Sequence, residues 1–197
     1  LILFERNCDN PEQVKALTNE FRQVIGREDA PVFIDQEGGR VTRLKPPQWR
    51  HPPPAKNFVD LANLKGEEIA TKAVKLNFRL IAEELQALGI NVNCTPVLDI
   101  PIAGANPIIG DRALGNDIGL IKKLAKAICD GLISGRVLPV IKHIPGHGRA
   151  LVDSHTDLPT VDATIEELIE TDFEAFRSLN DMPLAMTAHI IFSEIDE

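Results

Sequence analysis

The chain has 197 residues, of which 44% are hydrophobic and 25% are charged, the balance of an ordinary globular protein. Its formal net charge of −8 argues against a protein that binds nucleic acid, because phosphate backbones require a basic surface. The hydrophobic runs are short and interrupted by charged residues, so the sequence predicts no segment that spans a bilayer.

The hydrophobic pattern predicts strands and helices that alternate along the chain. In chain order we expect a strand at 1–5, a helix at 11–25, a strand at 31–36, a helix at 64–88 closed by Gly89, and a strand at 91–100. A helix at 116–133 ended by Gly135, a strand at 138–143, a helix from 164 to about 179 and a strand at 184–190 follow. Thr164 and Glu167 form the pattern of a capping box at the start of the last helix.

The alternation predicts an α/β fold with a parallel sheet, either open and doubly wound or closed into a barrel. Every predicted strand ends on polar or ionisable residues, namely Glu5, Asp35, Asp99, Lys142 with His143, and His189. Barrels collect their active sites from the ends of several strands, whereas an open sheet concentrates its site at one switch point. We therefore predict a (β/α)₈ barrel. Because a whole barrel needs roughly 250 residues, five strands make it partial, and we expect one domain over 1–197 that is truncated at both ends.

The three cysteines are Cys8, Cys94 and Cys129, an odd number at wide spacing. Two of them lie in hydrophobic stretches, which is typical of buried free thiols and not of a disulfide framework or a cysteine zinc site. The first residues also lack the basic start and the cleavage site of a signal peptide. We therefore expect a cytoplasmic protein.

The segment richest in reactive side chains is 142–155, which reads KHIPGHGRALVDSH. A strand delivers Lys142 and His143 to its end, after which proline and two glycines force the chain into a loop. Asp153 lies two residues before His155 and can accept a hydrogen bond from one ring nitrogen, which raises the basicity of the other. Such a pair suits general acid/base catalysis near neutral pH.

Two other interpretations of this segment remain open. A single histidine in a loop is often only solvated. Alternatively His143, His147, Asp153 and His155 are all good zinc ligands. Against the zinc site, Lys142 adjoins His143 and would repel a cation, and the glycines disfavour the helix that would bring His143 and His147 together.

Two further segments combine carboxylates with arginines. Residues 35–44 read DQEGGRVTRL, in which the double glycine permits a turn that lays arginines over the strand ends. Asp35 and Arg43 suit a polyhydroxylated ligand, because one accepts hydrogen bonds and the other donates several; a salt bridge that fixes the loop is the alternative. Residues 109–115 read IGDRALG and place Arg112 in a glycine-bracketed loop, where pairing with Asp99 is the structural alternative.

Together these segments resemble the bacterial β-N-acetylglucosaminidases of glycoside hydrolase family 3, of the peptidoglycan-recycling type. The resemblance rests on DQEGGRVTRL at 35–44, PVLD at 96–99, IGDRALG at 109–115 and KHIPGHG followed after four residues by DSH at 142–155. It covers essentially the whole chain, and the last motif is the most specific.

The resemblance implies a retaining exo-glycosidase that removes non-reducing terminal N-acetylglucosamine from muropeptides, without a metal or other cofactor. It implies that His155 is the general acid/base and Asp153 its partner. It also implies that five residues hold the terminal sugar: Asp35, Arg43, Arg112, Lys142 and His143. The family's nucleophile is an aspartate in an SDD motif, which this sequence lacks, so we assign no nucleophile and expect the chain to be inactive alone.

The partner expected from the resemblance is a carbohydrate, and we expect a monomer that binds neither nucleic acid nor a membrane. Two alternatives belong to other classes. One is a metal-dependent hydrolase on the same barrel, with the histidines as ligands. The other is a sugar-binding or scaffold protein without chemistry.

Overall fold

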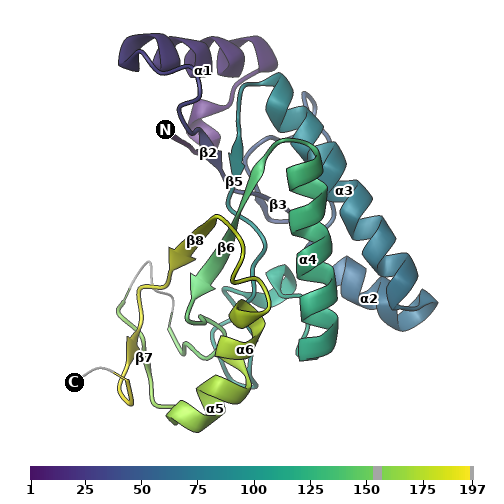
Figure 1. Cartoon of the computed structure of the whole chain (residues 1–197), viewed down its shortest axis with the longest axis vertical. Coiled ribbons are helices and arrows are strands. Elements are labelled where there is room, and N and C mark those ends of the chain that lie inside the picture. Colours follow the sequence, from purple (N-terminus) through teal and green to yellow (C-terminus); the bar gives the residue numbers. More distant parts are fainter. Residues whose placement is uncertain (153–156, 196–197) are drawn as a thin grey trace.

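The computed structural model describes residues 1–152 and 157–195 (Figure 1). Its centre is a parallel five-stranded sheet in the order β1-β2-β5-β6-β8. The strands are Ile2–Leu3, Phe33–Ile34, Val92–Asn93, Leu138–Ile144 and Leu184–Thr187. Because the spatial order follows the chain order, the sheet has no switch point, which is the arrangement of a barrel and not of a doubly wound sheet. The predicted partial barrel is confirmed.

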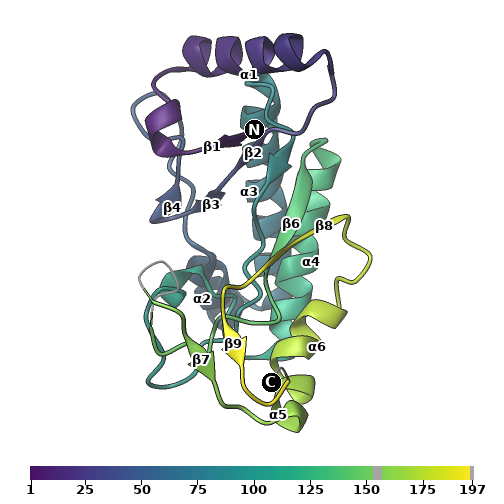
Figure 2. The same ribbon diagram turned by 90° about the vertical axis from the view of Figure 1, so that its left-hand side faces the viewer.

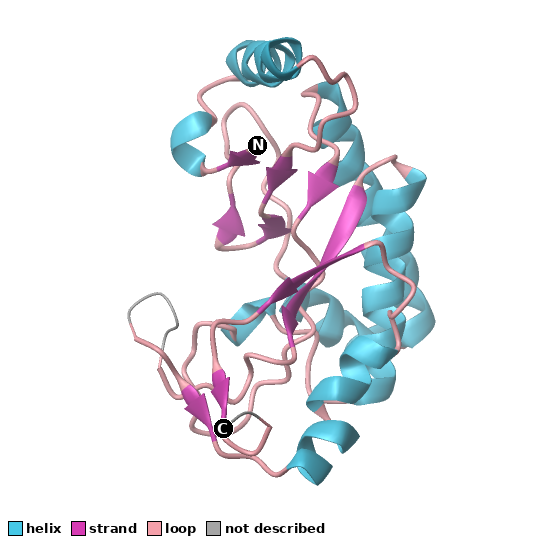
Figure 3. Cartoon of the chain, turned by 60° about the vertical axis from the view of Figure 1, so that its left-hand side comes forward, coloured by secondary structure: helices cyan, strands magenta, loops and turns pink. Residues whose placement is uncertain are grey.

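Two long helices cover one face of this sheet. They are α3, Glu67–Ala87, and α4, Ile118–Ser134, which lie side by side (Figures 1 and 3). Their inward side chains form the main core with the strands, and its fully or nearly fully buried members include Ile34, Ile81, Leu85, Leu98, Leu124 and Ile141. The helices thus brace the strands whose ends carry the polar residues.

Local sequence signals set several helix ends where the sequence predicts them. Helix α1 spans Pro11–Ile25, as predicted, because the Asn10 side chain accepts a hydrogen bond from the Gln13 amide and Gly26 ends the helix with a φ of 66°. Helix α5, Ile165–Glu170, begins at Thr164 with the predicted capping box.

One predicted helix is confirmed and another is wrong in extent. The helix expected at 64–88 is α3, and helix α2 at Ala55–Lys65, which the sequence pattern did not predict, precedes it and is separated from it by Gly66 with a φ of 95°. The helix expected from 164 to about 179 breaks at Thr171, whose φ of −121° and ψ of −88° are not helical. Its second half is α6, Asp172–Arg177.

Three short features depend on contacts that the sequence pattern does not reveal. The strand expected at 91–100 is reduced to β5 and a single bridge from Val97 to Lys142. The antiparallel strands β3, Gln36–Gly38, and β4, Val41–Thr42, follow β2, and β7, Thr160–Val161, pairs in parallel with β9, Ile191–Phe192 (Figure 2). Single 3₁₀ turns occupy Glu5–Asn7 and Gly110–Arg112.

The cysteines behave as predicted. Cys94 and Cys129 are buried and free, and Cys8 is free and half-buried. Burial raises the pKa of the Cys94 thiol to about 11 and that of Cys129 to about 12. Within the described residues, no helix combines the length and the hydrophobicity that crossing a membrane requires.

Candidate active site

A cleft of about 540 Å³ opens at the carboxyl ends of β2, β6 and β8. All five residues predicted to hold a sugar line it: Asp35, Arg43, Arg112, Lys142 and His143. His189, at the end of the last predicted strand, lines it too. Glu5 does not, because it is exposed and pairs with Lys45 at 2.7 Å. Asp99 does not line the cleft either, but it contacts His143, which does. The strand-end pattern therefore identified the correct edge of the sheet, with Glu5 as the exception.

Lys142 is the buried centre of the cleft's charged network, with 2% of its side chain exposed. Its Nζ lies 2.9 Å from Asp35 Oδ1 and 2.7 Å from Glu37 Oε1. Burial alone would raise the pKa of both carboxyls, but Lys142 and the neighbouring arginines more than offset this, and both pKa values lie below their usual range. Burial would lower the pKa of Lys142 itself, yet the carboxylates of Glu37 and Asp35 hold it above its usual value. The side chains of Lys142, Asp35 and Glu37 are therefore all charged at neutral pH.

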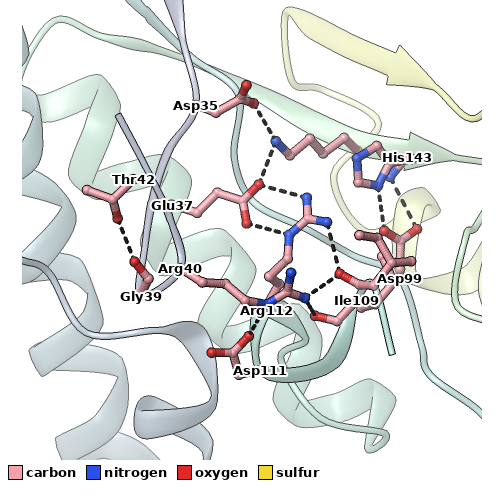
Figure 4. A network of polar contacts seen from close by, with 12 residues as sticks. Asp35, Glu37, Gly39, Arg40, Thr42, Asp99, Ile109, Asp111, Arg112 and His143 are labelled. Carbon is pink, nitrogen blue, oxygen red and sulfur yellow. Dashed lines mark hydrogen bonds and ion pairs between the residues drawn. The ribbon is translucent and has the colours of Figure 1, made fainter. Parts of the chain in front are cut away.

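Glu37 binds Arg112 through both of its oxygens (Figure 4). Arg112 Nε lies 2.8 Å from Glu37 Oε2 and Nη2 lies 2.9 Å from Oε1, a bidentate pair that fixes the guanidinium plane. Only 7% of the Glu37 side chain is exposed, and Lys142 also contacts Oε1. Glu37 therefore orients the two cations and has little capacity left for a ligand.

This role of Glu37 was missed by the sequence reasoning, and the suggested pairing of Asp99 with Arg112 is wrong. Asp99 instead contacts His143, and Arg112 forms an ion pair with Glu37. One signal was available, because Glu37 lies two residues after Asp35, and alternate residues of an extended chain share a face. A carboxylate at that spacing therefore points towards the same cations as Asp35.

Asp35 keeps capacity for a ligand. Its Oδ2 accepts a hydrogen bond from Arg43 Nη2 at 3.0 Å, so the salt bridge expected as an alternative does form. Its Oδ1 accepts one from Lys142, and 19% of the side chain remains exposed to the cleft. Because each carboxylate oxygen can accept about two hydrogen bonds, the ion pairs and a bound hydroxyl group are compatible.

A buried carboxylate also orients His143. Asp99 Oδ2 lies 2.6 Å from His143 Nδ1, and Asp99 Oδ1 accepts the backbone N–H groups of His143 at 3.2 Å and His147 at 2.7 Å. Burial would raise the pKa of Asp99, but the His143 hydrogen bond and these amides bring it below its usual value. The carboxylate keeps a proton on Nδ1, so the Nε2 atom is the one left for the cleft.

The loop after β6 requires its glycines for steric reasons. A Cβ added to Gly148 would lie 2.0 Å from the carbonyl oxygen of Ile100. His147, between the two glycines, lines the cleft, and burial lowers the pKa of its imidazole. The predicted acid/base His155 and its partner Asp153 lie outside the described residues.

Gly148→Ala is expected to lower the free energy of unfolding by at least about 1–3 kcal/mol, because the added methyl group meets backbone that can move only with the loop. Urea unfolding of the chain measures this. Gly119→Ala is the matched control, since the methyl group in helix α4 would meet only the Asp117 side chain, at 3.1 Å. Equal stability of the two variants would show that the loop rearranges freely.

Two of the four suggested zinc ligands, His143 and His147, lie within the described residues. In the ranges 1–152 and 157–195, no group of three or more histidine, cysteine, aspartate or glutamate residues is arranged to hold a metal ion. His143 and His147 have ring centroids 5.8 Å apart, and the other two suggested ligands, Asp153 and His155, fall outside these ranges.

Carboxylates, cations and an oriented imidazole that meet at the strand ends of a barrel define a site for a polyhydroxylated ligand. The chain belongs to glycosyl hydrolase family 3, whose N-terminal domain matches residues 1–197.

Individual relatives agree with this assignment. The β-hexosaminidase of Methylobacillus flagellatus is 36% identical over 200 residues, which cover 100% of this chain and 56% of that protein. NagZ from Neisseria gonorrhoeae in complex with N-trifluoroacetyl-D-glucosamine is 34% identical, with a TM-score of 0.91 over 99% of this chain and 56% of that one. NagZ from the same organism in complex with a zinc ion is 33% identical, with a TM-score of 0.91 over 99% of this chain and 57% of that one. The chain thus spans about half the length of the curated relatives it matches.

Proposed function

We propose that this chain forms the terminal-sugar site of a retaining exo-β-N-acetylglucosaminidase that acts on muropeptides released from peptidoglycan. The observation that carries the proposal is the convergence of Asp35, Arg112, Lys142 and His143 in one cleft. Its volume lies in the range of about 300–1,000 Å³ that is typical of small-ligand sites. A β-hexosaminidase and a glucosamine-derivative complex among the relatives support the choice of sugar.

In this proposal the cleft grips the ring hydroxyl groups of the terminal sugar. The Asp35 carboxylate accepts hydrogen bonds from hydroxyl groups, while Arg112 and Lys142 donate to hydroxyl oxygens. Glu37 holds both cations, so the donors keep their positions when the cleft is empty. Arg43 pairs with Asp35 at 3.0 Å and completes the set of predicted sugar-holding residues.

The proposed chemistry belongs to His155 and Asp153. An aspartate nucleophile, to which we assign no residue here, attacks the anomeric carbon while His155 protonates the departing oxygen. His155 then removes a proton from a water molecule that attacks the anomeric carbon and displaces the aspartate, which releases the sugar with retained configuration. Retaining enzymes mostly use a carboxylic acid in this role, so the histidine is supported by the family resemblance and not by the general rule.

We also propose that the protein acts as a monomer in the cytoplasm, on a carbohydrate, without a cofactor. The buried free thiols of Cys94 and Cys129 support a reducing compartment. The net charge of −8 supports a partner other than nucleic acid.

Asp35→Ala is expected to abolish measurable binding of N-acetylglucosamine to the chain. Each hydrogen bond to a charged group contributes about 1.5–3 kcal/mol, and Asp35 can accept two from the sugar. Isothermal calorimetry is the measurement. Asp111→Ala is the control, because it also removes a carboxylate that pairs with an arginine, Arg40, at 2.9 Å. If Asp35→Ala binds the sugar normally but melts earlier, Asp35 serves only as an ion-pair partner.

A metal-dependent hydrolase remains the second candidate, and the zinc complex of the Neisseria relative is the observation that favours it. Activity is measured on the extended chain, by which we mean these 197 residues joined to the remaining part of a family 3 relative. Activity that survives exhaustive chelation excludes the metal mechanism. Loss of activity that only added zinc restores would replace the acid/base role of His155 with a ligand role.

A further inference from the structure

The side chain of Arg149 extends from the loop after β6 to the start of helix α6. Its Nε lies 2.7 Å from Asp172 Oδ2, and its Nη2 donates to the Thr171 hydroxyl at 3.0 Å. Only 15% of the Arg149 side chain and 2% of the Asp172 side chain are exposed. This pair lies outside the network around Lys142, and neither residue lines the cleft.

The break between α5 and α6 is what aims Asp172 at the loop. Thr171 leaves the helical conformation, and the Asp172 carboxylate turns inwards beside Gly146, where an added Cβ would lie 2.7 Å from Asp172 Oδ1. Burial of an ionised carboxylate is costly unless a cation accompanies it. Arg149 supplies that cation, so the loop and the helix break stabilise each other.

The other side of the same loop is fastened to the segment after β5. The Ile102 amide donates to the Gly148 carbonyl at 3.2 Å, and the Asn106 amide donates to the Ala150 carbonyl at 2.8 Å. The His147 amide donates to Asp99, which also orients His143. The stem of the loop, residues 145–150, is therefore held between helix α6 and the wall of the cleft.

We infer that Arg149 and Asp172 are positioning residues that hold this stem, and with it His147, at the wall of the cleft. The inference rests on the proposed function, because that loop runs on in sequence to the proposed acid/base, His155. Arg149 lies in the four-residue interval between the GHG and DSH motifs, an interval that the family motif leaves unspecified. Its role follows from its contacts with Asp172 and Thr171.

Kinetics of Arg149→Gln in the extended chain test the inference. For a substrate with a poor, alcohol-like leaving group we expect kcat/KM to fall about 10²-fold, the usual effect of a misplacement of about 1 Å. For a nitrophenyl glycoside, which needs little acid assistance, we expect a loss below about threefold. Arg149→Lys, which keeps the charge, should recover part of the loss. Glu174→Gln is the control, because it removes the Lys122 contact of the same helix and leaves the loop untouched.

A second readout does not depend on activity. In the 197-residue chain, NMR titration of His147 should give a pKa below the ordinary histidine value, because the imidazole is buried. Arg149→Gln should raise this pKa towards about 6.5 by freeing the stem, and Glu174→Gln should leave it unchanged. A His147 that titrates as in the wild type, or equal losses on both substrates, overturns the inference. If His155→Ala shows no difference between the substrates, the proposed function fails, and the His147 titration still decides whether Arg149 anchors the loop.

Discussion

Replacing Lys142 by methionine should lower the free energy of unfolding at pH 7 by about 3–5 kcal/mol, the usual cost of removing one partner from a buried ion pair. Methionine fills a similar volume, so the loss is electrostatic and not a packing defect. Asp35 and Glu37 would then lie near each other without the cation they share, each left with a single arginine. Urea unfolding of the chain and of the variant measures the difference.

The pH dependence of this loss identifies its cause. In the wild type the pKa values of Asp35 and Glu37 are lowered on folding, so their contribution is complete above the unfolded values of about 4 and is lost as the pH falls through the folded ones. In Lys142→Met, burial and mutual repulsion raise the pKa values of Asp35 and Glu37. Protonation of either carboxylate therefore reduces the repulsion and stabilises the folded variant. The difference in free energy of unfolding between the wild type and Lys142→Met should therefore decrease as the pH falls from 7 to 4.

Lys45→Met is the matched control for Lys142→Met. Lys45 pairs with Glu5 at the surface, where both side chains are about half exposed, so the variant should lose less than about 1 kcal/mol with little dependence on pH. A Lys142→Met deficit that is small, or constant between pH 7 and 4, would contradict a buried charged network.

His155→Ala in the extended chain should slow the hydrolysis of substrates with poor leaving groups by about 10²–10⁴-fold, the usual contribution of a general acid. A nitrophenolate leaves without protonation, so nitrophenyl N-acetylglucosaminide should lose far less. The comparison of kcat/KM for the two substrates is the measurement. His51→Ala is the control, since His51 is exposed and does not line the cleft.

His155→Ala should lower the catalytic rate and leave sugar binding nearly unchanged. In the proposed mechanism the acid/base acts on the scissile oxygen and not on the ring hydroxyl groups, so His155→Ala should bind N-acetylglucosamine nearly as well as the wild type. Equal rate losses on both substrates would assign His155 a structural or metal-binding role in place of proton transfer.

Features that depend on nearby residues were predictable from the sequence. Asn10, Pro11 and Gly26 define helix α1 because capping acts within a few residues. The strand-end rule likewise predicted that Asp35 and Lys142 meet, although 107 positions separate them, because parallel strands present their carboxyl ends at one edge.

Features that depend on the choice among distant partners were not predictable. Arg112 has Glu37 and Asp99 as possible carboxylates, and only the path of its loop selects Glu37. The break at Thr171 has no glycine or proline to mark it, and it accompanies the burial of Asp172 beside Gly146.

The ion pairs around Lys142 also affect how the cleft responds to its surroundings. Lys142 and Arg112 are paired with Asp35 and Glu37 before any ligand arrives, and these four side chains are mostly shielded from water. Dissolved ions screen exposed charges far more than buried pairs, so the grip on an uncharged sugar should be almost insensitive to ionic strength. Because these side chains are already immobilised, closure on a sugar also freezes few additional rotamers. The cleft is therefore a stiff receptor whose selectivity comes from hydrogen-bond geometry and not from long-range attraction.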